Sequence, residues 1–105
     1  MDRVRVALIG AGNLASRYHY PSIASFPDVE IAAVCDLVRE KAEAVAARFG
    51  IPRVYTDYQA MIGQVEPDAV YAIMPSQHVF EPAVYALEQG RHLFIEHHSQ
   101  IGQGP

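Results

Sequence analysis

Two glycines separated by one residue are the part of this chain whose residue types and spacing point most directly to chemistry. The hexapeptide GAGNLA, which begins at Gly10, follows the apolar run VALI and matches the pattern G-x-G-x-x-[GA]. Gly10 permits a tight turn, and Gly12 lacks the Cβ that would hold a pyrophosphate away from the backbone. Asn13 and Leu14 open a helix whose N-terminal N–H groups can bind phosphate, and small Ala15 lets that helix pack closely. The pattern therefore predicts a phosphate-binding turn, and the alternative is a strand-to-helix turn that binds nothing.

Asp36 is the second candidate, at the end of the apolar run formed by residues 29–35. A carboxylate in this place can accept hydrogen bonds from both ribose hydroxyls of an adenosine, and it repels a 2′-phosphate. We therefore expect NAD as the cofactor rather than NADP. Arg39, nearby in the chain, weakens this preference because a guanidinium can hold a 2′-phosphate. Asp36 could instead cap the helix that begins at residue 38, a role compatible with ribose binding.

The remaining reactive side chains predict no catalytic residue and no metal site. His97 and His98 are adjacent, and neighbouring side chains on extended backbone point to opposite faces, so the two cannot easily share a metal ion. No set of carboxylates or cysteines accompanies them. Cys35 lies inside an apolar strand pattern without positive neighbours, so we interpret it as a small core residue.

Alternating strand and helix patterns must position these residues. In the clearest helix, residues 38–49, Ala42, Val45, Ala46 and Phe49 recur at the i, i+3, i+4, i+7 spacing of a buried stripe. Further helices are predicted at residues 13–20, 57–62 and 82–89, and strands at residues 4–9, 29–35, 53–55, 69–73 and 92–95.

Local signals predict where the helices end. Gly50 should stop the clearest helix, and Asp57 should cap the one that follows. Pro21 should break or kink the first helix, because proline lacks the backbone donor that a helix needs. The stretch MPSQH should form a loop, and Pro82 should lie in the first turn of the last helix.

The expected fold class is α/β. Strands that alternate with helices indicate a parallel sheet with helices on both faces, and right-handed crossovers favour the strand order 3-2-1-4-5. The sequence thus predicts a Rossmann-type three-layer sandwich with a five-stranded parallel sheet. We expect this dinucleotide-binding domain to span residues 1–98 and residues 99–105 to form an irregular tail.

Composition excludes several function classes. Half of the 105 residues are hydrophobic and 19% are charged, as in ordinary globular domains. The net charge of −4 comes without a basic cluster, so we do not expect nucleic acid as a partner. The single cysteine favours a reducing compartment, and the N-terminus resembles neither a signal peptide nor a membrane span. A cytoplasmic protein without membrane partners is the expectation.

The stretch DAVYAIMPSQHVFEPAVYALEQGRHLFIEHH carries a family resemblance. It is similar to the segment of the Gfo/Idh/MocA oxidoreductases in which a strand leads to T-P-N, then H, then A-L-x-A-G-K-H-V-F-x-E-K-P. Pro75 and His78 match, and Ser76 replaces the usual Asn. The resemblance, which covers about residues 4–96, implies that this loop lies along the ribose and nicotinamide side of the cofactor. It also implies that Glu96 faces the cofactor.

The same resemblance exposes departures. The family's E-K-P reads Glu96-His97-His98, so a histidine replaces the lysine that assists catalysis. A neutral imidazole is a weaker electrostatic partner for a substrate hydroxyl than an ammonium. After residue 98 the pattern lacks the helix and strand that the family would supply, and we expect the substrate domain to be absent.

These observations lead to an NAD(H)-binding domain of an oxidoreductase for a sugar- or polyol-like hydroxyl, not catalytic as the isolated chain. The reaction class is what the resemblance implies. The alternatives are a non-catalytic nucleotide-binding or redox-sensing module and a truncated or frame-shifted remnant. A methyltransferase fits less well, because its acidic residue before the glycine turn is replaced by Leu8-Ile9. The edge strand at residues 92–95 predicts a homodimer or larger assembly.

Overall fold

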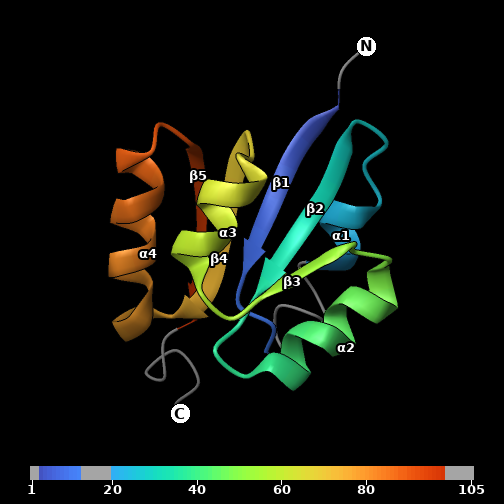
Figure 1. The fold of residues 1–105 in the computed structure, drawn as a ribbon, viewed down its shortest axis with the longest axis horizontal. Coiled ribbons are helices and arrows are strands. Elements are labelled where there is room, and N and C mark those ends of the chain that lie inside the picture. The colour runs from blue at the N-terminus through green and yellow to red at the C-terminus, as the bar shows by residue number, and fades with distance from the viewer. Residues whose placement is uncertain (1–2, 13–19, 99–105) are drawn as a thin grey trace.

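Five parallel strands form one sheet in the order β3-β2-β1-β4-β5 (Figure 1). The computed structural model describes residues 3–12 and 20–98, with the backbone alone at 75–77 and 96–98. The strands are β1 (Val4–Ile9), β2 (Val29–Cys35), β3 (Arg53–Tyr55), β4 (Ala69–Pro75) and β5 (His92–His98). The predicted fold class and strand order are confirmed.

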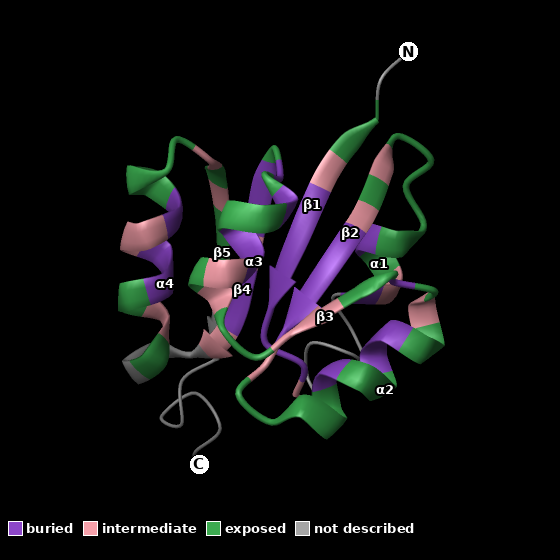
Figure 2. Cartoon of the chain, in the orientation of Figure 1, coloured by how far each residue is buried: buried purple, intermediate pink, exposed green. Residues whose placement is uncertain are grey.

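Helices cover both faces of this sheet. They are α1 (Tyr20–Ala24), α2 (Arg39–Phe49), α3 (Tyr58–Val65) and α4 (Ser76–Glu88). One core cluster joins α1 and α2 to the face that carries Leu8, and the other joins α3 and α4 to the face that carries Ala7 and Ile9. Side chains alternate between the faces of a strand, so both sides of β1 are buried, as Figure 2 shows.

α2 follows its sequence pattern closely. Ala42, Val45 and Ala46 are buried in its stripe against the sheet. Gly50 adopts a left-handed φ of 70° after the last turn, and its N–H donates to the carbonyl of Ala46. A residue with a Cβ is disfavoured at this angle, which explains why glycine ends the helix. On the exposed face, Arg39 pairs with Glu43 one turn later.

The region around the predicted loop is different from the prediction. β4 continues through Pro75, α4 starts at Ser76, and no loop separates them in the described backbone. The prediction of a helix over 82–89 is therefore wrong at its start, and Pro82 lies inside α4 rather than in its first turn. A proline inside a helix removes one hydrogen bond and its ring crowds the carbonyl four residues earlier, but it keeps a helical φ, so a helix tolerates it when packing compensates for this cost. Pro82 is buried, which supplies that packing.

Smaller differences concern helix ends near the other strands. The predicted helix at 13–20 lies outside the described residues except for Tyr20. Pro21 is the second residue of α1 as described, and its carbonyl accepts from the N–H of Ser25 at 3.2 Å; the predicted break at Pro21 concerns the chain before it, outside the described residues. Asp57 caps α3 as expected, accepting from the N–H of Gln59 at 2.9 Å. α3 and β5 extend three residues further than predicted, to Val65 and His98.

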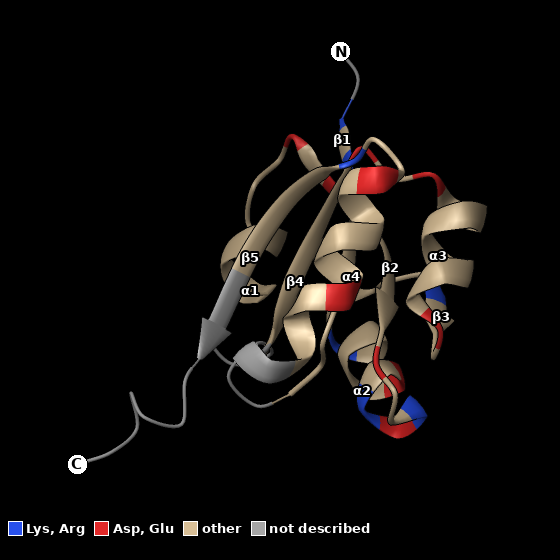
Figure 3. Ribbon diagram, turned by 90° about the vertical axis from the view of Figure 1, so that its left-hand side faces the viewer, with Lys and Arg blue, Asp and Glu red and all other residues tan. Residues whose placement is uncertain are grey.

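β5 is an edge strand, since β4 is its sheet neighbour and no strand of the described chain lies beyond it. Phe94 is 55% exposed and stacks on Tyr71 of β4, with ring centroids 5.8 Å apart. Ile95, on the opposite face, is 43% exposed. Figure 3 looks toward this side of the molecule and shows no charged residue along the described part of β5. None of the helices in the described ranges is long and apolar enough to cross a membrane.

Candidate functional site

A pocket of about 370 Å³ opens at the carboxyl ends of the central strands. In open α/β sheets this edge is where ligands bind, beside the point at which the strand order reverses. Most of its lining residues come from the ends of β1, β2 and β4 and from α4, among them Gly10, Asp36, Met74, His78, Glu81 and Pro82. The pocket therefore unites three of the residues predicted from sequence, Gly10, Asp36 and His78.

Gly10 is required by the packing of the backbone. Its φ is +104°, and a Cβ at this position would overlap the carbonyl oxygen of Ile73 in β4. Its N–H donates to the carbonyl of Cys35 at 2.8 Å, which extends the pairing of β1 with β2 past the strand end. A side chain is thus excluded here by both conformation and space.

Gly12 contrasts with Gly10. A Cβ built on Gly12 has no atom within 4 Å among the described neighbours, and its φ lies outside the left-handed region. The described part of the chain therefore leaves space beside this residue and gives no packing reason for a glycine. A ligand phosphate that approaches the backbone would require one.

Asp36 uses both of its carboxylate oxygens. Oδ2 accepts from the N–H of Ala11 at 2.8 Å, and Oδ1 accepts from the N–H of Val38 at 2.8 Å. Val38 is the N-cap of α2 and no side chain caps that helix, so the expectation that Asp36 caps it is wrong. The carboxylate instead forms a turn before the helix and ties it to the glycine turn. It has about four acceptor positions, so two remain for a ribose diol.

Tyr20 contacts the same turn, and the sequence analysis did not include it among the candidates. Its hydroxyl donates to the carbonyl of Gly10, and the side chain is fully buried. Burial above all, and then the negative charge of Asp36, raise the pKa of this hydroxyl far above its ordinary range. No motif marks this tyrosine, because the contact arises only when α1 packs on the sheet.

The residues predicted along the nicotinamide side come from the β4–α4 junction. Pro75 is the last residue of β4, Ser76 is the first of α4, and His78 lies in the first turn of α4 at the pocket. Glu96 lies in β5 opposite Ile73 of β4 in the strand register. These backbone positions place all four near the carboxyl edge of the sheet.

The three other predicted residues are Arg39, Asn13 and Leu14. Arg39 is not among the residues that line the pocket, and its Nε lies 3.1 Å from a carboxylate oxygen of Glu43 on the outer face of α2. Asn13 and Leu14 fall outside the described residues.

Cys35 also borders the pocket, where it is buried at the end of β2. Burial first, and then the nearby carboxylates of Asp36 and Asp57, raise the pKa of its thiol to about 12. The thiol therefore stays protonated and unreactive at neutral pH, in agreement with its interpretation as a core residue. Among residues 3–12, 20–74 and 78–95, whose side chains the structure describes, no three metal-ligating side chains come together.

Comparison with known protein families decides the identity of this arrangement. A family model described as "Oxidoreductase family, NAD-binding Rossmann fold" matches residues 4–97. The chain belongs to the Gfo/Idh/MocA oxidoreductase family. Its sheet is therefore an NAD-binding Rossmann domain, as the sequence predicted.

Relatives within the Gfo/Idh/MocA family agree with this assignment. The chain is 39% identical over 93 residues to D-glucoside 3-dehydrogenase of Escherichia coli K12, covering 89% of the chain and 26% of that protein. Among solved structures, a dehydrogenase from Chromobacterium violaceum matches with a TM-score of 0.84 and 30% identity, covering 90% of the chain and 28% of the other. KijD10, a 3-ketoreductase from Actinomadura kijaniata solved with NADP, matches with a TM-score of 0.82 and 29% identity, over 90% and 30% of the two chains. The chain thus spans less than a third of each relative.

Proposed function

We propose that this domain binds NAD(H) at the pocket and serves hydride transfer between the nicotinamide and a sugar-like hydroxyl. The observation that carries the binding site is the contrast between the two glycines. Gly10 is required by the protein's own packing, whereas the open space beside Gly12 suits a pyrophosphate. The half-buried carboxylate of Asp36 lies at the same pocket with acceptor capacity to spare, so the residues present fit an adenosine dinucleotide.

We assign the remaining roles along the length of the cofactor. Gly12 and the N–H groups of Asn13 and Leu14 hold the pyrophosphate, and Asp36 accepts from the adenosine ribose, which favours NAD over NADP. Arg39 stays paired with Glu43 on the outer face and contributes little.

On the other half of the cofactor, we assign Pro75, Ser76, His78 and Glu96 to the nicotinamide ribose side. Their positions at the carboxyl ends of β4 and β5 and in the first turn of α4 support this assignment. The bound cofactor supplies the hydride chemistry, and the protein supplies its binding and orientation.

The substrate class follows from relatives. The name of the D-glucoside 3-dehydrogenase places its chemistry on a sugar, and that of the 3-ketoreductase names reduction of a carbonyl, so a sugar hydroxyl is the substrate we propose. We further propose that the 105-residue chain binds the cofactor without turning it over. His97 stands where family members carry a lysine, and a neutral imidazole stabilises a developing alkoxide less than an ammonium does.

Self-association and location complete the proposal. The exposed Phe94 and Ile95 on the edge strand β5 support a homodimer or larger assembly, because an unpaired edge is a template for another strand.

A cytoplasmic location is supported by the single buried thiol, which requires no oxidising compartment.

Calorimetric titration of the chain with NAD, NADH, NADP and NADPH tests the binding site. The unmutated chain should bind NADH, and Gly12→Val should abolish binding without changing the far-UV circular dichroism, because its side chain fills the phosphate position. Gly63→Val is the matched control, since Gly63 is exposed on α3 with equally open space beside it and is not part of the glycine turn. Retention of NADH binding by Gly12→Val would show that the glycine turn is only a connector.

A further inference from the structure

We propose that Tyr20 is a positioning residue for the phosphate-binding turn, which rests on the proposed NAD site. Its side chain lies behind the turn, on the core side, and is not among the residues that line the pocket. Tyr20 therefore acts on the cofactor only through the backbone that the cofactor contacts.

One peptide unit is held at both of its ends. The unit that joins Gly10 to Ala11 accepts at its carbonyl from the hydroxyl of Tyr20 and donates from its N–H to Oδ2 of Asp36 at 2.8 Å. The two partners come from α1 and from the residue that follows β2, outside the glycine turn itself. The orientation of this peptide plane is therefore set by tertiary contacts rather than by the glycine itself.

Tyr20 is itself immobilised. It is fully buried, and its ring packs edge-on against Phe49 of α2, with centroids 6.5 Å apart and planes at 87°. The raised pKa keeps the hydroxyl protonated at ordinary pH, so it remains a donor. A buried phenol needs a partner, and the carbonyl of Gly10 is the acceptor that satisfies it.

The consequence concerns the backbone that the turn presents to a phosphate. Glycine adopts both signs of φ easily, so the peptide after Gly10 has an accessible flipped orientation when it is unrestrained. In the observed orientation the Gly10 carbonyl points into the core toward Tyr20. Loss of the Tyr20 hydrogen bond would free this peptide to reorient, which would withdraw the N–H of Ala11 from Asp36 and displace the backbone that leads into Gly12. Tyr20 thus keeps the backbone of the turn in a single orientation for the phosphate.

Tyr20→Phe tests this role, because it removes the hydroxyl and keeps the buried ring. We expect ADP-ribose and NADH to bind about tenfold more weakly, the effect of one buried hydrogen bond, while the affinity for adenosine is unchanged. Adenosine contains the ribose and base but no phosphate, so a general loss of stability would weaken it as much as ADP-ribose. Exchange of the Ala11 amide hydrogen, followed by NMR, should also become faster.

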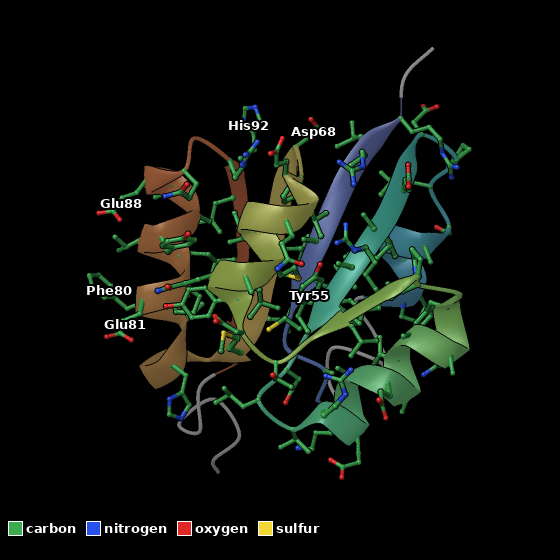
Figure 4. The ribbon with its side chains drawn as sticks, in the orientation of Figure 1. Tyr55, Asp68, Phe80, Glu81, Glu88 and His92 are labelled. Atoms are coloured by element: carbon green, nitrogen blue, oxygen red, sulfur yellow. The ribbon has the colours of Figure 1, made fainter. Side chains whose placement is uncertain are left out.

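Tyr55→Phe is the matched control. Its hydroxyl donates to Oε1 of Gln64 at 3.0 Å, and Tyr55, labelled in Figure 4, lies on β3 outside the pocket lining. The affinities of this variant for both ligands should equal those of the unmutated chain. Equal affinities in Tyr20→Phe, or equal losses for ADP-ribose and adenosine, would overturn the inference. Failure of the unmutated chain to bind either NADH or ADP-ribose would instead contradict the proposed function.

Discussion

At the scale of single residues, Asp36 combines two tasks that are usually considered separately. Its two hydrogen bonds to the backbone N–H groups of Ala11 and Val38 fix the glycine turn and the start of the segment that leads into α2. We propose that the same carboxylate also accepts the ribose diol. A substitution here should therefore affect both cofactor affinity and cofactor choice.

For the unmutated chain we predict tighter binding of NADH than of NADPH. Asp36→Ala should reduce NADH affinity by about one to two orders of magnitude, as expected for losing hydrogen bonds to a charged group. NADPH should lose less, because the repulsion of its 2′-phosphate disappears at the same time. Titration calorimetry measures both affinities. Equal binding of the two cofactors before mutation would rule out the assigned role of Asp36.

At the scale of elements, α4 shows how packing overrides a local signal. Pro82 in its interior removes the hydrogen bond to the carbonyl of His78, four residues earlier. Its buried position nevertheless places the ring against the pocket wall. Figure 4 shows Phe80 and Glu88 of the same helix projecting away from the sheet, consistent with their exposure.

Pro82→Ala should stabilise the domain by about 1 kcal/mol. The free energy gained from the restored helix hydrogen bond should exceed two costs, the lost packing of the ring and the higher conformational entropy of the unfolded chain. Urea unfolding measures the change. Pro52→Ala is the control, because Pro52 is exposed in the turn before β3 and its replacement should lower stability by about 0.4–1 kcal/mol. A less stable Pro82→Ala would mean that packing of the ring outweighs the missing bond.

At the scale of the whole molecule, the β5 edge should determine how copies associate. The described strand carries Leu93, Phe94 and Ile95 in succession, and the last two are exposed. An edge with exposed apolar side chains of this kind pairs readily with another strand. A symmetric dimer is the simplest closed assembly that buries it.

Sedimentation of the 105-residue chain at micromolar concentration should therefore reveal a dimer or larger species. Ile95→Lys should shift it to monomer, because a charge at the edge opposes strand pairing. Phe26→Lys, which changes an exposed aromatic residue in the turn before β2, should leave the assembly intact. A monomeric unmutated chain would contradict the prediction.

The sequence by itself determined the sheet and the identity of its ligand-binding edge. Apolar runs of strand length alternate with helical patterns, and right-handed crossovers leave one strand order, so topology follows from local signals. Asp57 likewise caps the start of α3, and Gly50 ends α2, through contacts within a few residues. Gly10 and Asp36 were found because both adjoin strand ends in a recognised spacing.

Only the tertiary structure decided how the site is held together. Tyr20 meets Gly10 because α1 packs on the sheet beside β1, and no local pattern encodes that contact. Gly10 and Gly12 look alike in the motif. The carbonyl of Ile73 in β4, distant in sequence, excludes a side chain at Gly10, whereas no described atom does so at Gly12. The start of α4 was missed for the same reason. Local sequence favours a proline in the first turn of a helix. Pro82 lies in the interior of α4 instead, because its burial against the rest of the fold compensates for the cost.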